Sequence, residues 1–441
     1  MSDSVRTGDR RVRQAVLASM IGTTIEYYDF FIYGAAASLV FNKLFFSSVA
    51  PGVGLLLSLS TFAIAFVMRP VGGAIFGHFG DRFGRKRAMF VTVVLMGVAT
   101  VAIGVLPTYG QVGVAAPVLL VVLRLVQGLA LGGESSGGWV LTMETARPER
   151  RGLLGAVVNS GSGWGLLLGN IIFLLLSRLP EDAFLTWGWR VPFLLSAVLI
   201  VVGVYIRLRL EETPEFRRVE RTVTVRKAPL AEAVRQGWRH MILVGLASIG
   251  LAINFYVASV FSLSYGTKTL GFSRGTVLSI ILVVTAAMVV STPIFGWISD
   301  RIGRKPVFVA AAVTFVVAPF VWFPLFGTGN YALMLIGFVV VFLAYSATSA
   351  VMPAFLSQVF PTEIRYSALA VSVNIGAVLG GSLAPLIATA LLESSGKWLA
   401  VAAYVGVISI FSVVGGLLLP DAPGRIVGTA TSAGDLAPVV S

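Results

Sequence analysis

A short polar stretch that occurs twice constrains what this chain can fold into. It reads GHFGDRFGRK at Gly77–Lys86 and returns as GWISDRIGRK at Gly296–Lys305. Glycine permits tight reversal of the chain, and the charged side chains cannot enter hydrocarbon. Each copy is therefore predicted to be a polar hairpin that joins two membrane-spanning helices on the same face. One basic loop could reflect topology alone, but its recurrence favours a duplicated fold.

The composition indicates that most of the chain lies in lipid. Of 441 residues, 56% are hydrophobic and 12% are charged, and the mean hydropathy is +0.90. A soluble protein carries about 25% charged residues. The net charge of +13 has no soluble basic domain to carry it, so we expect the lipid bilayer as a partner and no nucleic acid.

Side chains that bind metals or catalyse reactions are scarce. The chain has no cysteine and two histidines, His78 and His240, both near predicted helix ends. We therefore expect no disulfide, no metal site and no cofactor. No nucleophile with a neighbouring base is evident, so the sequence does not indicate an enzyme.

Apolar runs set the number of predicted spans. A spanning helix needs about 20 mostly apolar residues. Twelve such runs are predicted, at 15–40, 54–78, 88–106, 117–145, 153–177, 191–210, 241–265, 276–299, 307–327, 332–358, 367–392 and 398–419. An even number places both termini on the same side of the membrane.

The distribution of basic residues indicates which side that is. Of the 33 Lys and Arg residues, 25 fall in the termini and the loops on their side, six in the opposite loops and two inside helices. Loops rich in Lys and Arg stay in the cytoplasm. Both termini are therefore predicted to be cytoplasmic.

The repeated motif, after the second and eighth runs, resembles the loop motif of the major facilitator superfamily. The resemblance implies an all-α membrane protein with twelve transmembrane helices in two pseudo-symmetric six-helix bundles around a central cavity. The predicted parts are a cytoplasmic N-terminus at 1–14, bundles at 15–206 and 241–420, a cytoplasmic linker at 207–240 and a disordered cytoplasmic tail at 421–441.

Ionisable side chains inside spanning helices cost several kcal/mol, so each one suggests a function. Glu26, Asp29 and Tyr33 share a face of the first helix, since they are three and four residues apart. Arg69 lies in the second helix and Arg124 in the fourth. Estimated depths favour Asp29–Arg124 and Glu26–Arg69 pairs, although crossed pairing fits the helix borders too.

Two interpretations of these charges remain open. They could lock the N-terminal bundle as buried ion pairs, or they could relay protons. We favour the relay, in which protonation of an acid frees an arginine for an anionic substrate. Glu134, lower in the fourth helix, is a candidate second proton site or inner-gate residue, and a structural role at the interface is equally open.

Further segments resemble the metabolite:proton symporter family, whose members are similar to carriers of shikimate, 2-oxoglutarate, citrate and proline or betaine. They are EYYDFFIYG in the first helix, RLVQG with Gln127 in the fourth, WGWRVPF at 187–193 and FPTEIRYS at 360–367. One departure is Ser135–Ser136, where an aromatic residue commonly follows the GGE motif. The tail also lacks the coiled coil expected of osmosensing betaine carriers.

The second half supplies uncharged polar groups. Asn254, Tyr256 and Tyr345 could bind polar atoms of a substrate, although packing roles explain each one equally well. Asn159 and Asn170 could face the cavity or bond across helices. Glycines in GSGWGLLLGN, Gly161–Asn170, are predicted to allow close helix packing rather than nucleotide binding.

The two motif copies are predicted to form a cytoplasmic gate. Exposed N–H groups at a helix N-terminus favour a carboxylate. Pseudo-symmetry directs Asp81 to the helix that starts near Ser367, and Asp300 to the one that starts near Gly152. The predicted gating residues are Gly77, Asp81, Arg82, Arg85, Gly296, Asp300, Arg301 and Arg304.

Together these features predict a proton-coupled symporter of the plasma (inner) membrane, acting as a monomer. It would carry a small polar metabolite, either an organic anion, in particular a carboxylate, or a zwitterion. An exporter or drug/proton antiporter of the same fold is the first alternative. A non-transporting receptor is the second, but the chain shows no soluble signalling domain.

Overall fold

The computed structural model describes residues 2–83, 85–132, 139, 142–143, 146–209, 229–361 and 364–420. Every secondary-structure element among these residues is a helix. Residues 210–228 of the predicted linker and the whole predicted tail, 421–441, lie outside the described residues.

The helices of the first half are α1 (Ser2–Ala36), η1 (Ala37–Phe41), α2 (Asn42–Leu44), α3 (Pro51–Phe83), α4 (Arg85–Gly104), α5 (Tyr109–Val112), α6 (Ala115–Gly132), η2 (Pro148–Arg150), α8 (Arg151–Leu176), α9 (Glu181–Thr186), η3 (Gly188–Arg190) and α10 (Val191–Arg209). Those of the second half are α12 (Pro229–Tyr256), η4 (Val257–Phe261), α13 (Ser262–Ser264), η5 (Tyr265–Thr269), α14 (Arg274–Ile302), α15 (Arg304–Gly327), α16 (Tyr331–Ser357), α17 (Arg365–Gly376), η6 (Ala377–Ser382), α18 (Ala384–Ser395) and α19 (Trp398–Leu418).

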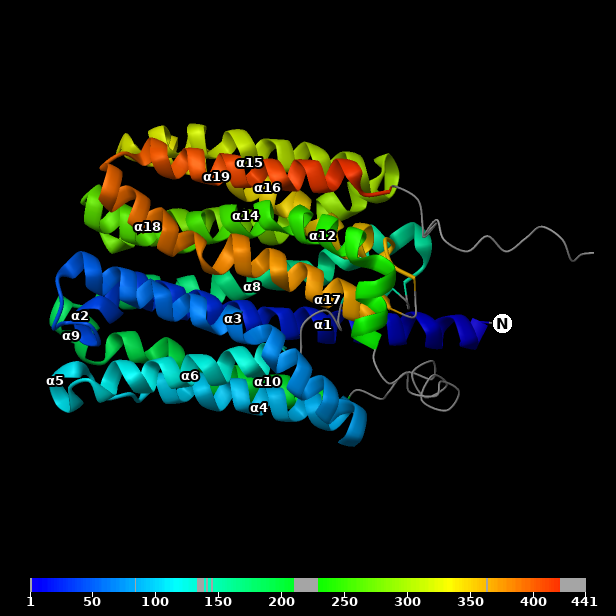
Figure 1. Ribbon diagram of the computed structural model, residues 1–441, viewed down its shortest axis with the longest axis horizontal. Helices are drawn as coiled ribbons and strands as arrows, with labels where there is room; N and C mark the ends of the chain where they lie inside the picture. The colour runs from blue at the N-terminus through cyan, green and yellow to red at the C-terminus, as the bar shows by residue number, and fades with distance from the viewer. Residues whose placement is uncertain are drawn as a thin grey trace, which may run out of the picture.

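The long helices run roughly along one axis of the molecule (Figure 1). Those of the first half lie mainly in the lower part of this view and those of the second half in the upper part. The N-terminus and the end of α19 lie at the same end, while α2, α5 and α9 lie at the other. The chain therefore has a terminal end and an opposite end, and these two names are used below.

Each predicted apolar run overlaps a helical stretch of the described residues, and the end of the run at 117–145 lies largely outside them. Among the described residues, ten helical stretches are long and apolar enough to cross a membrane, and Phe90–Gly104 is a shorter apolar helix. Two helices begin several turns before the predicted runs, because a helix need not begin where its apolar residues begin. Thus α1 starts at Ser2 and α12 at Pro229.

The second motif copy joins two long helices by a tight reversal, as predicted, but most of its residues lie within the helix ends. Asp300 and Arg301 lie in the last turn of α14, and α15 starts at Arg304. Gly303 alone makes the reversal, with φ of 98°. Only glycine adopts this backbone conformation readily, which explains the glycine at this motif position.

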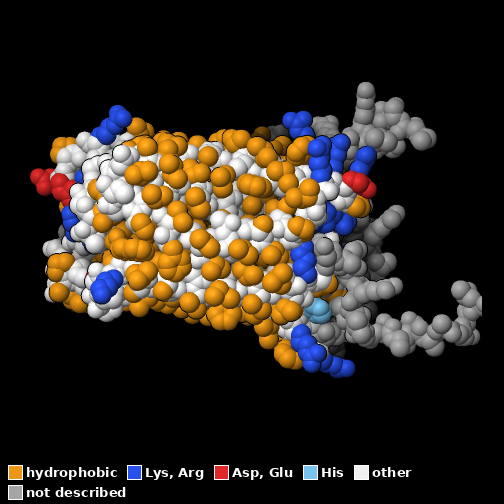
Figure 2. All heavy atoms as spheres, turned by 90° about the horizontal axis from the view of Figure 1, so that it is seen from above, with side chains coloured by type: hydrophobic (Ala, Val, Ile, Leu, Met, Phe, Trp, Pro, Cys, Tyr) orange, Lys and Arg blue, Asp and Glu red, His pale blue; other side chains and the backbone are white. Residues whose placement is uncertain are grey.

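The surface between the two ends is apolar. Figure 2 shows hydrophobic side chains along the middle of one face and Lys and Arg side chains near both ends. Large apolar residues are exposed there, including Val98 (62%), Val201 (69%) and Val290 (63%). Such a wide apolar surface is stable in lipid rather than in water.

Polar side chains and glycines connect the helices. Asn159 Nδ2 donates to the carbonyl of Ser349 at 2.7 Å, and Asn170 Nδ2 to that of Leu278 at 2.7 Å. Both bonds join α8 to the second half. A Cβ at Gly165 would lie 2.4 Å from the carbonyl oxygen of Thr24, so α8 approaches α1 closely. The packing role predicted for the glycines is confirmed.

Candidate functional site

Glu26 and Arg69 form an ion pair beside the second half. Arg69 Nη2 donates to Glu26 Oε1 at 2.8 Å, and Nη1 donates to Asn374 Oδ1 on α17 at 3.5 Å. The guanidinium lies 4.6 Å from the ring centre of Phe30 and 4.7 Å from that of Phe66. Arg69 is 6% exposed, and its Nε has no hydrogen-bond partner among the described residues. The predicted Glu26–Arg69 contact is present, and one buried donor is left over.

Asp29 and Arg124 are linked through two other side chains rather than as the ion pair suggested by depth. Asp29 accepts from Thr100 at 3.0 Å and from Ser196 at 2.9 Å. Gln127 Nε2 donates to Thr100 Oγ1 at 2.7 Å, and Arg124 Nη1 donates to Gln127 Oε1 at 2.9 Å. The chain Arg124–Gln127–Thr100–Asp29 therefore connects the two charges.

Arg124 is held on all sides by the first half. Its Nε and Nη2 donate to the carbonyls of Thr61 at 3.3 Å and Phe62 at 3.1 Å. The guanidinium lies 3.7 Å from the ring centre of Tyr33, whose hydroxyl bonds to Thr61 Oγ1 at 2.6 Å. Since Arg124 is 1% exposed and each of its nitrogens donates to the protein, it has a fixed position in the bundle.

Aromatic rings from both halves meet next to Arg69. Tyr256 lies 5.6 Å from Phe66, Tyr345 stacks on Phe255 at 4.6 Å, and Tyr27 contacts the same Phe255 at 5.8 Å, all measured between ring centres. Together these rings form a buried layer with polar hydroxyls, which suits a small solute with an apolar body.

Asn254 lies elsewhere, because its side chain joins two helices of the second half. Its Nδ2 donates to the carbonyl of Gly250 and to Ser409 Oγ on α19, both at 2.9 Å. This contact corresponds to the packing alternative named above.

Three residues of this region were not predicted from the sequence: Thr100, Ser196 and Asn374. A single hydroxyl in an apolar helix usually bonds to the carbonyl four residues earlier, and Thr100 also does so, to Met96 at 3.0 Å. Nothing in the pattern distinguishes it from Ser248, whose hydroxyl bonds to the carbonyl of Val244 at 2.8 Å.

At the terminal end, Asp300 caps the start of α8. Its carboxylate oxygens accept from the backbone N–H groups of Gly152 at 2.8 Å and Leu153 at 2.9 Å. Arg304 lies 3.7 Å from Asp300 and donates to the carbonyl of Pro148 at 3.2 Å. The predicted contact of Asp300 with this helix is therefore present, and it joins the two halves.

The other motif residues have different surroundings. A Cβ at Gly296 would lie 2.7 Å from the carbonyl oxygen of Gly152, so glycine allows α14 to approach α8. The guanidinium of Arg301 lies 3.6 Å from the ring centre of Trp297 on its own helix. The surroundings of the remaining predicted residues lie outside the described part of the structure; these residues are Gly77, Asp81, Arg82, Arg85 and Glu134.

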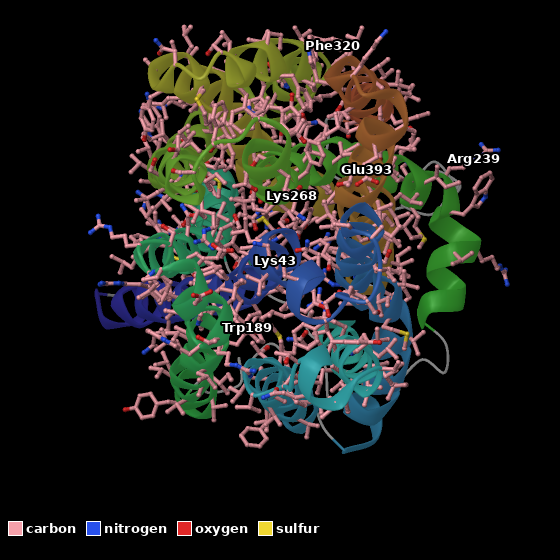
Figure 3. All side chains as sticks on the ribbon, turned by 90° about the vertical axis from the view of Figure 1, so that its left-hand side faces the viewer. Lys43, Trp189, Arg239, Lys268, Phe320 and Glu393 are labelled. Carbon is pink, nitrogen blue, oxygen red and sulfur yellow. The ribbon has the colours of Figure 1, made fainter. Side chains whose placement is uncertain are left out.

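A second ionic contact joins the halves at the opposite end. Glu181 on α9 binds Lys43 at 2.7 Å and Arg274 on α14 at 2.9 Å. These hydrogen bonds and charges hold the pKa of the Glu181 carboxyl below its ordinary value. Figure 3 looks onto this end and shows Lys43, Lys268 and Glu393 near its middle.

Two family models match the chain in succession. Residues 14–238 match the model described as "Sugar (and other) transporter", and residues 247–441 match that of the Major Facilitator Superfamily. The chain belongs to the major facilitator superfamily. The family resemblance drawn from the repeated motif is thus confirmed.

Relatives within the superfamily cover most of the chain. The Inner membrane metabolite transport protein YhjE of Escherichia coli (strain K12) is 39% identical over 87% of this chain and 88% of its own length. The shikimate transporter of the same organism is 36% identical over 93% of this chain and 95% of its own length. A proline/betaine transporter of Salmonella typhimurium is 32% identical over 98% of this chain and 88% of its own length.

Solved structures agree on the fold. The crystal structure of a D-xylose-proton symporter has a TM-score of 0.73 and 19% identity, covering 93% of this chain and 98% of that one. A partially occluded inward open conformation of the xylose transporter XylE from E. coli has a TM-score of 0.71 at 17% identity. The match covers 94% of this chain and 99% of that one. The chain is therefore an all-helical multi-pass metabolite transporter of the inner membrane, and not an enzyme.

Proposed function

We propose that this transporter imports a small carboxylate together with protons by alternating access. In this proposal twelve helices span the membrane in two six-helix bundles, and both termini are cytoplasmic, as the distribution of Lys and Arg predicts. The terminal end of the molecule then faces the cytoplasm and the opposite end faces the outside.

The observation that carries the proposal is the Glu26–Arg69 ion pair. It lies beside the second half with Arg69 buried and Glu26 21% exposed, and Arg69 keeps an unpaired Nε donor among the described residues. A buried cation is stable only when it is paired. When Glu26 takes up a proton the ion pair is lost, and a substrate carboxylate can replace it with two parallel hydrogen bonds to the guanidinium.

Asp29 provides a second acidic group, bonded to Thr100 and Ser196. Its link to Arg124 through Gln127 and Thr100 means that a change of charge at Asp29 alters hydrogen bonds on α4 and α6. In the proposal, proton binding at Asp29 thereby favours one arrangement of the first half over another.

Alternating access requires contacts that break at each end in turn. Asp300 with the start of α8 would close the cytoplasmic end, and Glu181 with Arg274 would close the outer end. Asp81, the counterpart of Asp300 in the first motif copy, is proposed to cap the helix that starts near Ser367.

The test is uptake by the purified protein in proteoliposomes with an imposed pH gradient and a panel of carboxylates. We expect uptake of one carboxylate class that follows the proton gradient and stops when the gradient is collapsed. The variants Glu26→Gln and Arg69→Lys should lose gradient-driven uptake, because one removes the titratable group and the other the two-pronged donor.

A matched control separates these effects from damage to the fold. Lys397→Gln changes an exposed charge outside the described helices and should leave uptake unchanged. Full gradient-driven uptake by both Glu26→Gln and Arg69→Lys would contradict the proposal. Accumulation of hydrophobic cations on the opposite side, with no carboxylate uptake, would favour the drug antiporter instead.

A further inference from the structure

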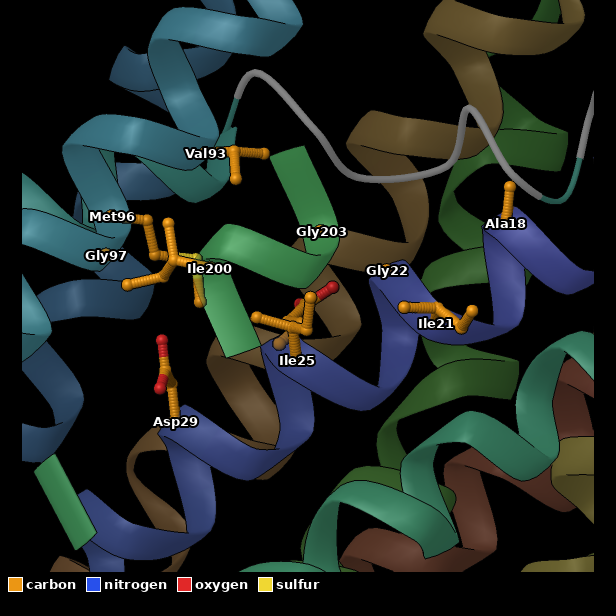
Figure 4. Close-up of a pocket in the computed structure, with 11 residues that line it drawn as sticks. Ala18, Ile21, Gly22, Ile25, Asp29, Val93, Met96, Gly97, Ile200 and Gly203 are labelled. Carbon is orange, nitrogen blue, oxygen red and sulfur yellow. The ribbon is translucent and has the colours of Figure 1, made fainter. Parts of the chain in front are cut away.

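A narrow groove inside the first half has Asp29 among its lining residues. It is lined by α1, α4 and α10 and includes Ala18, Ile25 and Asp29 on α1, Gly97 on α4 and Ile200 on α10. Figure 4 shows Ile25 lying between Ala18 and Asp29 along α1. All of its lining residues belong to the first half, and Glu26 is the lining residue that also pairs with Arg69 beside the second half.

The groove leads toward the terminal end. Ala18, Gly22, Ile25 and Asp29 recur at helical spacing, so they lie on one face of α1. From Ala18 to Asp29 the helix rises about 16 Å. Ala18 is nearer the N-terminus, and Asp29 lies at the inner limit with 5% of its surface exposed.

Two isoleucines narrow the groove by packing against glycines. A Cβ at Gly97 would lie 2.1 Å from Cδ1 of Ile200, and a Cβ at Gly203 would lie 2.7 Å from Cδ1 of Ile25. A side chain larger than that of glycine at position 97 or 203 would therefore collide with the isoleucine that faces it. Rotation of these two side chains changes the opening without movement of a helix.

Charged and titratable groups surround the inner limit. Glu26 also lines the groove and pairs with Arg69 of α3. From α6, Arg124 reaches Asp29 through the hydrogen-bond chain described above. Thr100 of α4 and Ser196 of α10 each donate a hydroxyl hydrogen bond to the Asp29 carboxylate. Tyr28 of α1 donates to the carbonyl of Pro192 on α10 at 2.7 Å.

We propose that this groove is a proton path between Asp29 and the cytoplasm, separate from the path of the solute. The proton leaves the Asp29 carboxyl, whose O–H bond breaks, and joins a water molecule in the groove. The solute moves between the two halves, so a bound solute does not block release of the proton. The inference rests on the proposed function, since it concerns the proton of that symport.

The chain has no cysteine, so a single introduced cysteine would be the only thiol that a labelling reagent can modify. Ile200→Cys places a thiol in the groove, and Val201→Cys places one at nearly the same depth, on a side chain that is 69% exposed on the apolar surface. The probe is a charged, membrane-impermeant methanethiosulfonate applied to inside-out vesicles. It reacts with thiolates in water, so we expect position 200 to react at least about tenfold faster than position 201.

A second readout links the groove to proton movement. Once labelled at position 200, the transporter should take up its carboxylate more slowly under a pH gradient, while label at 201 should leave uptake unchanged. Equal labelling rates at the two positions, or unchanged uptake after complete labelling at 200, would overturn the inference. Labelling is measured without solute, so the two proposals can be tested separately. Slow labelling at position 200 with intact proton-driven uptake refutes the proton path alone. Fast labelling at position 200 without any proton-driven uptake refutes the proposed symport.

Discussion

Asp300 offers the sharpest test of how the two halves are held together at the terminal end. Its carboxylate accepts two backbone N–H bonds, at 2.8 and 2.9 Å, from the start of α8, and its side chain is 9% exposed. Asp300→Ala removes both bonds and leaves two helix N–H groups without their acceptor. In the proposed alternating access the contact exists only while this end is closed, so its loss should shift the equilibrium toward the open state.

The size of the shift follows from the bonds. A hydrogen bond to a charged group contributes about 1.5–3 kcal/mol, and water replaces part of it at this end of the molecule. We take about 2–3 kcal/mol for the pair of bonds, which corresponds to roughly 30- to 150-fold in the equilibrium between closed and open states. Asp300→Asn keeps an acceptor oxygen but loses the charge, so its effect should be intermediate.

The assay uses a single cysteine at Ser162, a buried α8 residue whose hydroxyl accepts from Tyr345 of the second half at 3.4 Å. A charged thiol reagent added to inside-out vesicles reports opening of the terminal end. Asp300→Ala should raise the labelling rate by the factor above. Asp182→Asn, a change at the opposite end, serves as the control and should not raise it. An unchanged rate in Asp300→Ala, with the protein folded, would refute the reasoning.

Three further predictions concern other parts of the chain. Asp81→Ala should likewise open the terminal end, measured as faster labelling of the same cysteine; an unchanged rate would count against a symmetric pair of caps. Arg124→Gln removes the charged donor from the carbonyls of Thr61 and Phe62 and should lower stability by about 1.5–3 kcal/mol for each lost bond, measured by thermal unfolding in detergent; an unchanged midpoint would contradict this. The pKa of Glu181 is lowered by Lys43 and Arg274, so its ion pairs are complete above the ordinary value of 4.5 and are lost only as pH falls through the lower value. Opening of the opposite end should therefore stay constant from about pH 8 to 5. Glu181→Gln removes exposed ion pairs of about 0.2–1 kcal/mol each and should increase this opening at every pH in that range; a rise in opening between pH 7 and 5 in the unmodified chain would be inconsistent with this assignment.

Much of the architecture could be predicted from the sequence because it depends on local patterns. The apolar runs mark the helices, since about 20 apolar residues in succession are stable only in lipid or a large core. The repeat of the motif predicted that Asp300 meets the helix beginning near Gly152, because pseudo-symmetry and the free N–H groups of a helix start are both readable from the chain.

The partners of the buried charges were decided by the tertiary structure. Glu26 and Asp29 are three residues apart on one helix, yet Glu26 turns to Arg69 and Asp29 to Thr100 and Ser196. The side chains they meet depend on how α1 is rotated and on which helices pack beside it. An estimate of depth along a helix carries no information on that rotation, so only the packed bundle determines that Asp29 reaches Arg124 through Gln127 and Thr100.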